Sequence, residues 1–144
     1  MKAMLAAGTV VLGLGVLAFA VQGALASKEG KKVDPRVFEL RTYTAKPGKM
    51  KALHTRFKDH TNKLFEKHGM TIIGFWSPLD EKQADEKLIY LLAFPSKEAA
   101  DKSWKAFRED PDWVKAKNAS EKDGPLVQKV ESVYLNPTDY SPLK

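Results

Sequence analysis

The sequence contains no cysteine among its 144 residues. This absence excludes disulfide bonds, cysteine nucleophiles, iron–sulfur clusters, cysteine-ligated zinc sites and lipoprotein acylation. The fold must therefore be held by its hydrophobic core alone, even in an oxidising compartment. The sequence also lacks a Walker phosphate-binding loop, a G-x-S-x-G nucleophile motif and a recognisable catalytic triad order, so nothing in it indicates a hydrolase or a nucleotide-dependent enzyme.

Histidine is scarce as well, and the three histidines are poorly spaced for a metal site. His54, His60 and His68 lie six and eight residues apart, whereas two ligands on one helical face need i,i+4 spacing. No metal site is predicted. The 24 Lys and Arg residues exceed the 18 Asp and Glu residues, but we expect the excess to be spread over a solvated surface. No basic stripe with interleaved aromatic residues indicates nucleic-acid binding.

The N-terminus carries the three parts of a secretory signal. Lys2 precedes an apolar run over residues 3–21, and Ala24-Leu25-Ala26 ends it with a small-x-small triplet. This pattern predicts a signal peptide over residues 1–26, cut near Ala26-Ser27, and an exported protein that is periplasmic or secreted. An uncleaved membrane anchor is the alternative, because the run approaches the length that spans a bilayer. Stable membrane association is expected only in that case.

The remaining chain alternates between strand-like and helix-like patterns. Residues 27–36 are charged and predict a flexible lead-in, and a single domain is expected over residues 37–135, followed by a C-terminal tail over 136–144. Period-two runs predict strands and 3.6-period stripes predict helices. In order, we expect a strand at 37–43, a helix at 49–68, strands at 70–76 and 88–94, and a helix between Ser96 and Asp110. A short third helix then starts at Pro111, runs through Trp113 and is broken by Gly124-Pro125, and a strand follows at 126–135.

This order predicts an α+β fold of the ferredoxin-like βαββαβ type, a four-stranded antiparallel sheet with both main helices on one face. Residues 88–94 are all apolar, and simple alternation places Ile72 and Trp76 on one face of their strand with Ile73 and Phe75 on the other. Helices cover only one face, so the other would expose apolar side chains. We expect a second copy to cover it, as a homodimer. The alternative is that the third helix or the C-terminal tail folds over it.

From residue 37 onward the sequence resembles the NIPSNAP family. Nearly all of residues 37–143 match in order and spacing, in the segments Phe38-Glu39-Leu40-Arg41-Thr42-Tyr43-Thr44, Lys46-Pro47-Gly48-Lys49, Leu64-Phe65-Glu66-Lys67-His68-Gly69, Gly74-Phe75-Trp76, Ala99-Ala100, Trp104, Phe107-Arg108, Asp110-Pro111-Asp112-Trp113 and Pro137-Thr138-Asp139-Tyr140-Ser141-Pro142-Leu143. The resemblance implies a dimeric α/β barrel built from ferredoxin-like protomers. The family's biochemical role is poorly defined, and the exported N-terminus is not part of its pattern.

The wider superfamily includes cofactor-free monooxygenases, isomerases and haem enzymes, so the resemblance also implies a pocket without fixing its chemistry. Two hypotheses follow. The first is a non-catalytic dimeric module that binds a small apolar molecule or a protein partner. The second is an oxygenase-like or haem-dependent enzyme with a helix–sheet pocket around His60. No cofactor is predicted under the first hypothesis, and haem enters only under the second.

His60 is the candidate catalytic residue because it lies three residues after Phe57 and four before Leu64, which predicts that it points toward the sheet. An imidazole there could act as acid, base or axial ligand, or could simply be a buried histidine satisfied by one hydrogen bond. The candidate ligand-binding residues are His60, Phe57, Arg41, Trp76 and Trp104.

Glu39, Arg41 and Tyr43 share one face of the first predicted strand. If that face lines the dimer interface, Arg41 could bind an anion or a carboxylate. The competing interpretation is an internal ion pair between Glu39 and Arg41, favoured because an unpaired buried charge is costly.

Overall fold

The structure is a computed structural model that describes residues 36–144. The predicted signal peptide (1–26) and nearly all of the predicted lead-in (27–36) lie outside the described residues. Cleavage and export therefore stay predictions.

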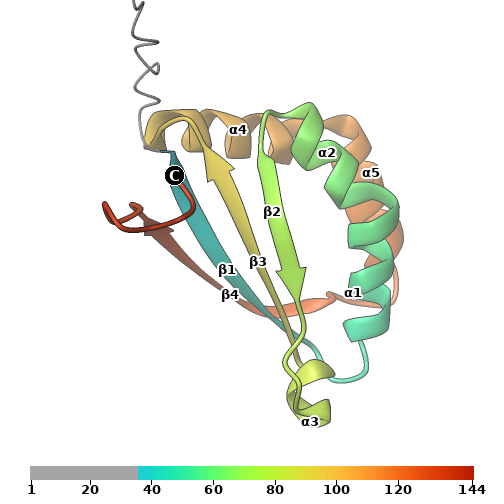
Figure 1. Cartoon of the computed structure of the whole chain (residues 1–144). Coiled ribbons are helices and arrows are strands. Elements are labelled where there is room, and N and C mark those ends of the chain that lie inside the picture. Colours follow the sequence, from blue (N-terminus) through green and yellow to red (C-terminus); the bar gives the residue numbers. More distant parts are fainter. Residues whose placement is uncertain (1–35) are drawn as a thin grey trace, which may run out of the picture. The chain divides into compact units, whose positions relative to one another are not determined.

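Four strands form one antiparallel sheet in the spatial order β2-β3-β1-β4 (Figure 1). The strands are β1 (Val37–Ala45), β2 (Thr71–Trp76), β3 (Lys87–Phe94) and β4 (Val127–Leu135). β1 pairs with both β3 and β4, so the first strand lies in the interior of the sheet and β2 and β4 form its edges. This is the ferredoxin-like arrangement, and the predicted fold class is confirmed.

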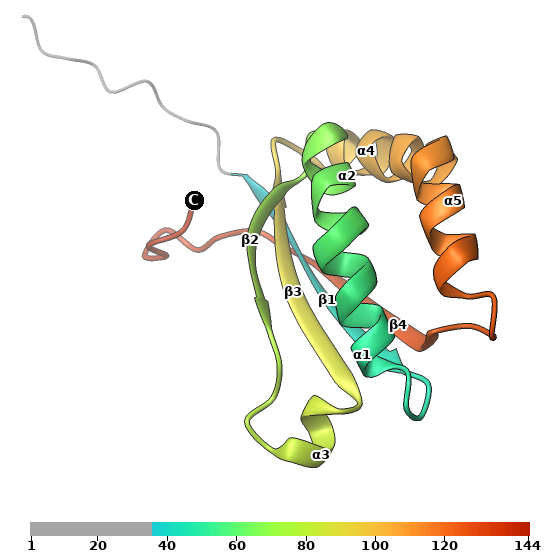
Figure 2. The same ribbon diagram turned by 90° about the vertical axis from the view of Figure 1, so that its right-hand side faces the viewer.

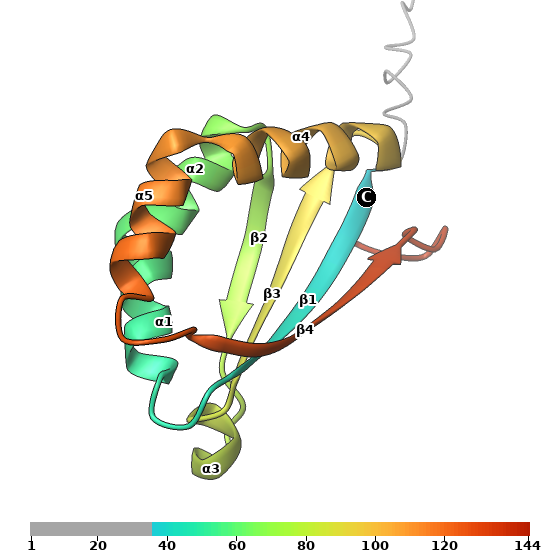
Figure 3. The same cartoon turned by 180° about the vertical axis from the view of Figure 1, so that it is seen from behind.

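The helices lie on one face of the sheet (Figure 2). A continuous helical rod consists of α1 (Met50–Arg56), a π-helical turn η1 (Phe57–Thr61) and α2 (Asn62–Lys67). Beside it lie α4 (Lys97–Glu109) and α5 (Pro111–Ser120), which meet at a sharp corner (Figure 3). A further short helix, α3 (Glu81–Ala84), occupies the connection between β2 and β3, where no helix was predicted.

The helix boundaries follow the sequence signals. Ser96 caps α4 by accepting a hydrogen bond from the Ala99 backbone N–H at 3.1 Å, and Asp110 caps α5 by accepting one from the Asp112 N–H at 2.8 Å. Short oxygen-bearing side chains suit these positions because they satisfy N–H groups that the first turn leaves free. Gly69 ends the rod with a φ of 75°, a conformation that costs glycine nothing.

The π-helical turn changes which side chains of the rod face the sheet. The Asn62 N–H bonds to the Phe57 carbonyl, five residues back, and the Thr61 hydroxyl donates to the Arg56 carbonyl at 3.2 Å. A turn closed over five residues rather than four advances each side chain by a smaller angle. Thr61 is consequently buried at 1% exposure, whereas His60 points outward and is exposed. The predicted orientation of His60 toward the sheet is therefore wrong.

A bulge in β2 likewise overturns the predicted alternation of that strand. The pairing register with β3 shifts between Ile72 and Gly74, so one extra residue enters the strand. As a result Ile72 and Phe75 both pack against the core on the helix side. Trp76 lies on the other face, where its ring covers Gly74 so closely that an added Cβ would sit 2.9 Å from it.

The core between sheet and helices is largely aromatic. Phe65, at 1% exposure, lies at its centre, with ring centroids 5.4 Å from Trp104, 5.0 Å from Phe107 and 5.9 Å from Tyr90. Trp113 packs α5 onto the domain through a ring 4.5 Å from that of Phe107. Offset and edge-to-face aromatic contacts of this kind add to the stabilisation that comes from burial.

The opposite face of the sheet is only partly covered. Leu40, Trp76, Val133 and Leu135 keep between 36% and 53% of their surface exposed there. The C-terminal tail crosses one end of this face (Figure 2), and Phe38 beneath it is 5% exposed. The tail is tied to the start of β1 by a 2.8 Å hydrogen bond from Arg36 Nε to the Lys144 carbonyl. The tail thus covers part of the sheet face opposite the helices, and the rest of that face stays open.

Candidate functional site

A buried carboxylate joins β1, β4 and α4. Glu39 is 1% exposed. Its Oε1 accepts hydrogen bonds from Arg41 Nη1 at 2.6 Å and from Ser132 Oγ at 2.5 Å, and its Oε2 accepts one from Trp104 Nε1 at 2.5 Å. Each oxygen of the carboxylate therefore has at least one donor, as a buried charge requires.

This cluster faces the helices rather than the open face, because Arg41 lies across from Tyr90, a core residue. The Arg41 guanidinium also stacks over the Trp104 ring at 4.2 Å. Burial acts to lower the pKa of Arg41, but Tyr90, Tyr43 and Glu39 together raise it above the ordinary value, and the group stays charged. The ion-pair interpretation of Glu39 and Arg41 is confirmed, and Arg41 does not line the open sheet face.

A cleft lies between the π-helical turn and the edge strand β2. It has a volume of about 290 Å³. Its lining residues come from the rod, from the end of β2 and from β3, and they are His54, Phe57, Lys58, Asn62, Phe75, Trp76, Ser77 and Leu88. Phe57 and Trp76, two of the predicted ligand-binding residues, belong to this lining, although the Trp76 ring lies against Gly74 on the open face of the sheet. His60, Arg41 and Trp104 do not belong to it.

The cleft has an apolar floor and a polar rim. The rings of Phe57 and Phe75 meet edge to face at 5.7 Å, and both contribute to the core side of the cleft. His54 and Lys58 are exposed at its rim. Among the side chains of residues 36–144, Asn62 Oδ1 is one of the few buried polar atoms without a hydrogen-bond partner. An apolar pocket with a few convergent polar groups is the usual form of a small-molecule site.

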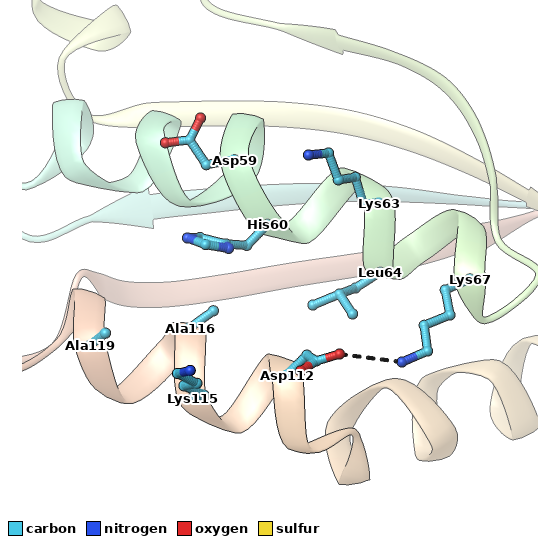
Figure 4. A pocket seen from close by; sticks show the side chains of 9 residues that line it. All are labelled: Asp59, His60, Lys63, Leu64, Lys67, Asp112, Lys115, Ala116 and Ala119. Carbon is cyan, nitrogen blue, oxygen red and sulfur yellow. Dashed lines mark ion pairs between the residues drawn. The ribbon is translucent and has the colours of Figure 1, made fainter.

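His60 lines a different groove, on the outer side of the rod against α5 (Figure 4). The groove measures about 480 Å³, and its lining residues are Asp59, His60, Lys63, Leu64, Lys67, Asp112, Lys115, Ala116 and Ala119. Most of these side chains are charged, and Lys67 pairs with Asp112 at 3.5 Å, as the dashed line in Figure 4 shows. The groove lies between the rod and α5, and Leu64, Ala116 and Ala119 are the apolar residues of its lining.

At one end of this groove, Asp110 ties the rod to α5. Its Oδ2 lies 2.8 Å from Lys67 Nζ and 2.7 Å from His68 Nε2. Hydrogen bonds from Lys67 and His68 hold the pKa of Asp110 well below its usual range. A carboxyl group whose pKa is lower in the folded state stabilises the fold above its unfolded pKa, and that contribution is lost as the pH falls.

We therefore expect the thermal stability of the protein to fall below about pH 4, partly through Asp110. In Asp110→Asn the amide keeps the capping oxygen but cannot ionise, so the melting temperature at neutral pH should drop and its decline between pH 6 and pH 3 should be shallower. Melting curves followed by circular dichroism measure both effects. Asp139→Asn, which changes an exposed aspartate of the tail, is the control and should leave the pH profile unchanged. An unaltered slope in Asp110→Asn would contradict this linkage.

Within residues 36–144, no three His, Asp or Glu side chains lie close enough together to hold a metal ion. In the same part of the chain, no helix is both long and apolar enough to cross a bilayer.

Sequence patterns did not reveal the cleft residues His54, Asn62 and Phe75. A straight α-helix places Asn62 on the solvent side of the stripe, and simple alternation places Phe75 on the face opposite Ile72. A signal was nonetheless present, because Thr61 falls four residues after Phe57 and Phe65 four after Thr61. This spacing makes the helix face through Thr61 an alternative to the face through His60 as the side that packs on the sheet.

The NIPSNAP family model matches residues 38–142. Two NIPSNAP family proteins from Agrobacterium tumefaciens strain C58, one of them described as of unknown function, have similar structures. The protein of unknown function is 21% identical to this chain, with a TM-score of 0.65, and the match covers 76% of this chain and 95% of its own. The other is 20% identical, with a TM-score of 0.66, and the match covers 76% of this chain and 99% of its own. An uncharacterised NIPSNAP-like domain protein from Burkholderia xenovorans shows 16% identity over 74% of this chain and 89% of its own, with a TM-score of 0.64.

No curated protein matches the chain by sequence. At these identities the structural likeness establishes the fold, and the family model, which spans most of the chain, establishes the family. The order of strands and helices from β1 to the tail, together with that match, shows that the chain belongs to the NIPSNAP family.

Proposed function

We propose that this protein is an exported, non-catalytic homodimeric domain that binds a small, largely apolar molecule. The observation that carries the proposal is the sheet face opposite the helices. Four large apolar side chains remain substantially exposed on it although the tail already covers one end. A contiguous apolar surface on a small domain marks an interaction site.

A second copy of the chain is the occupant that suits this face best. Leu40 pairs laterally with Val133 and with Leu91, so the exposed side chains form one continuous patch across three strands. The patch contains no charged side chain between these residues, and a twofold arrangement would bury the same patch on both copies. The helices would then lie on the outside of the dimer.

Small-molecule binding is assigned to the cleft between η1 and β2. It has the aromatic floor described above, and one predicted ligand residue, Phe57, forms part of that floor. π-Helical turns occur frequently at functional sites, since they carry an extra residue whose side chain is redirected. Here the turn supplies both Phe57 and, at its end, Asn62.

The alternative hypothesis, an oxygenase-like or haem-dependent enzyme around His60, has no observation in its favour. It requires an imidazole within the helix–sheet layer. His60 is exposed on the outer side of the rod.

The dimer is tested by placing a charge in the open face. Val133→Asp, on β4, should convert a dimer into a monomer because burying an unpaired carboxylate in an apolar interface is strongly unfavourable. Val114→Asp is the matched control: Val114 lies on α5 and is 45% exposed, compared with 53% for Val133. Light scattering coupled to size exclusion gives the masses. A wild-type protein that is monomeric at its highest attainable concentration would contradict the proposal.

A further inference from the structure

The excess positive charge of the described chain is concentrated in the helical rod and in the turn that precedes it. Residues 46–67 contain seven Lys and Arg residues against two Asp and Glu residues, whereas the rest of residues 36–144 contains thirteen against fourteen. Asp59 and Glu66 are interspersed with these basic residues, so the segment is a mixture with a local positive excess rather than an unbroken basic block. A local excess of one sign raises the concentration of oppositely charged small molecules near it.

The cleft beside η1 opens within this positive region. Lys58 and His54 are exposed at its rim and come from the rod itself. No Asp or Glu belongs to the lining, so a ligand there meets cationic and neutral groups only. In the groove against α5, by contrast, Asp59 and Asp112 share the lining with the lysines.

The floor of the cleft favours a flat apolar group. The rings of Phe57 and Phe75 meet there at 5.7 Å, and Leu88 closes the base. Aromatic rings prefer offset or edge-to-face contact with one another. The volume of about 290 Å³ admits a compound with a single ring and small substituents, but it is near the lower limit for ligand pockets.

The cleft also contains a hydrogen-bond acceptor that has no donor. Within residues 36–144, the buried Oδ1 of Asn62 receives no hydrogen bond, and Asn62 belongs to the lining of the cleft. A buried acceptor without a donor is unfavourable, because it has lost its hydrogen bonds to water without gaining one in the protein. A ligand or a water molecule that donates a hydrogen bond there would remove this cost.

We propose that the cleft binds a small aromatic acid that carries a hydroxyl group. The ring packs against Phe57 and Phe75, the carboxylate lies at the rim toward Lys58 and His54, and the hydroxyl donates to Asn62 Oδ1. This assignment rests on the proposed function, because it names the ligand class of the same site.

The test uses four probes of one ring: 4-hydroxybenzoate, benzoate, phenol and toluene. Each is titrated into the protein, and binding is followed by amide chemical-shift changes, which also locate it. We expect 4-hydroxybenzoate to bind most tightly, with benzoate and phenol each weaker by about three- to tenfold, in line with the loss of one charge or one hydrogen bond. The shifts should centre on residues 54–62 and 75–77.

Two variants separate the contributions of charge and hydrogen bond. Lys58→Gln should weaken the binding of 4-hydroxybenzoate and benzoate by about three- to fivefold, since an exposed ion pair contributes up to about 1 kcal/mol. The binding of phenol and toluene should not change. Lys63→Gln, an exposed lysine of the same rod that lines the other groove, is its control. Asn62→Leu should remove the advantage of 4-hydroxybenzoate over benzoate, and melting curves will show that the variant is folded.

The outcomes distinguish the ligand class from the proposed function. If phenol and toluene bind in the cleft while the carboxylates gain nothing and Lys58→Gln behaves like Lys63→Gln, the acid is the wrong ligand class and the apolar binding site stands. If the hydroxyl confers no advantage in the wild type, Asn62 Oδ1 is satisfied by water and the inference is overturned. If none of the four probes shifts the cleft residues, small-molecule binding there fails as well.

Discussion

Replacing Glu39 with alanine should lower the free energy of unfolding by about 3–5 kcal/mol, the range found when one partner of a buried ion pair is removed. The Glu39 carboxylate is the common acceptor for Arg41, Ser132 and Trp104. Without it, the largely buried guanidinium loses its counter-charge and the indole N–H loses its acceptor. The domain is small enough that such a loss is a large part of its total stability. Urea denaturation followed by tryptophan fluorescence measures the effect.

Two further variants test the reason for this loss. The double variant Glu39→Leu/Arg41→Met replaces the pair by apolar side chains of similar size and should recover most of the stability, because no unpaired charge is left behind. Glu131→Ala removes an exposed glutamate of β4, which pairs with Lys129, and should leave stability almost unchanged. If Glu39→Ala proved as mild as Glu131→Ala, the buried pair would not be needed to hold β1, β4 and α4 together.

Phe65→Ala should also lower the free energy of unfolding by about 3–5 kcal/mol, through the lost burial of the ring and the cavity that it leaves. Phe65 touches aromatic rings from η1, β3 and α4. Its removal therefore loosens the contact between the rod, the sheet and α4 at the same time. Chemical denaturation measures the change, and a decreased m-value would show that the core had become less compact.

Tyr140→Ala is the matched control for Phe65→Ala, since it removes an aromatic ring of the tail that is 85% exposed. Its effect should be close to zero. If Phe65→Ala cost no more than Tyr140→Ala, the inward row through Thr61 and Phe65 would not be the packing side of the rod. The straight-helix row through His60 would then need to be reconsidered.

The strands could be predicted from sequence almost to the residue. The predicted ranges 37–43, 70–76, 88–94 and 126–135 differ by two residues at most from β1, β2, β3 and β4. Local signals sufficed because β-branched and aromatic runs alternate with glycine and proline at the ends. The caps Ser96 and Asp110 also marked the starts of α4 and α5 correctly, since capping depends only on neighbouring backbone groups.

The candidate site could not be predicted in the same way. Phe57 and Trp76 do line the cleft, but Arg41 and Trp104 belong to the buried Glu39 cluster, and His60 lies on the outside. Each of these differences comes from a departure from ideal periodicity or from a contact between distant segments. One π-helical turn rotated the second half of the rod, and one bulge reversed part of β2.

The sequence by itself determined the class of fold, the order and ends of its elements, the absence of cysteine chemistry and the family resemblance, since these depend on composition and on neighbours along the chain. Tertiary structure alone decided which side chains meet. The Glu39 carboxylate accepts hydrogen bonds from Trp104, which is 65 residues away in the sequence, and from Ser132, which is 93 residues away. The ring of Phe57 packs against that of Phe75 across the helix–sheet boundary. A single extra residue in a helix or a strand redirects every side chain after it, and packing, rather than local pattern, decides where that residue is accommodated.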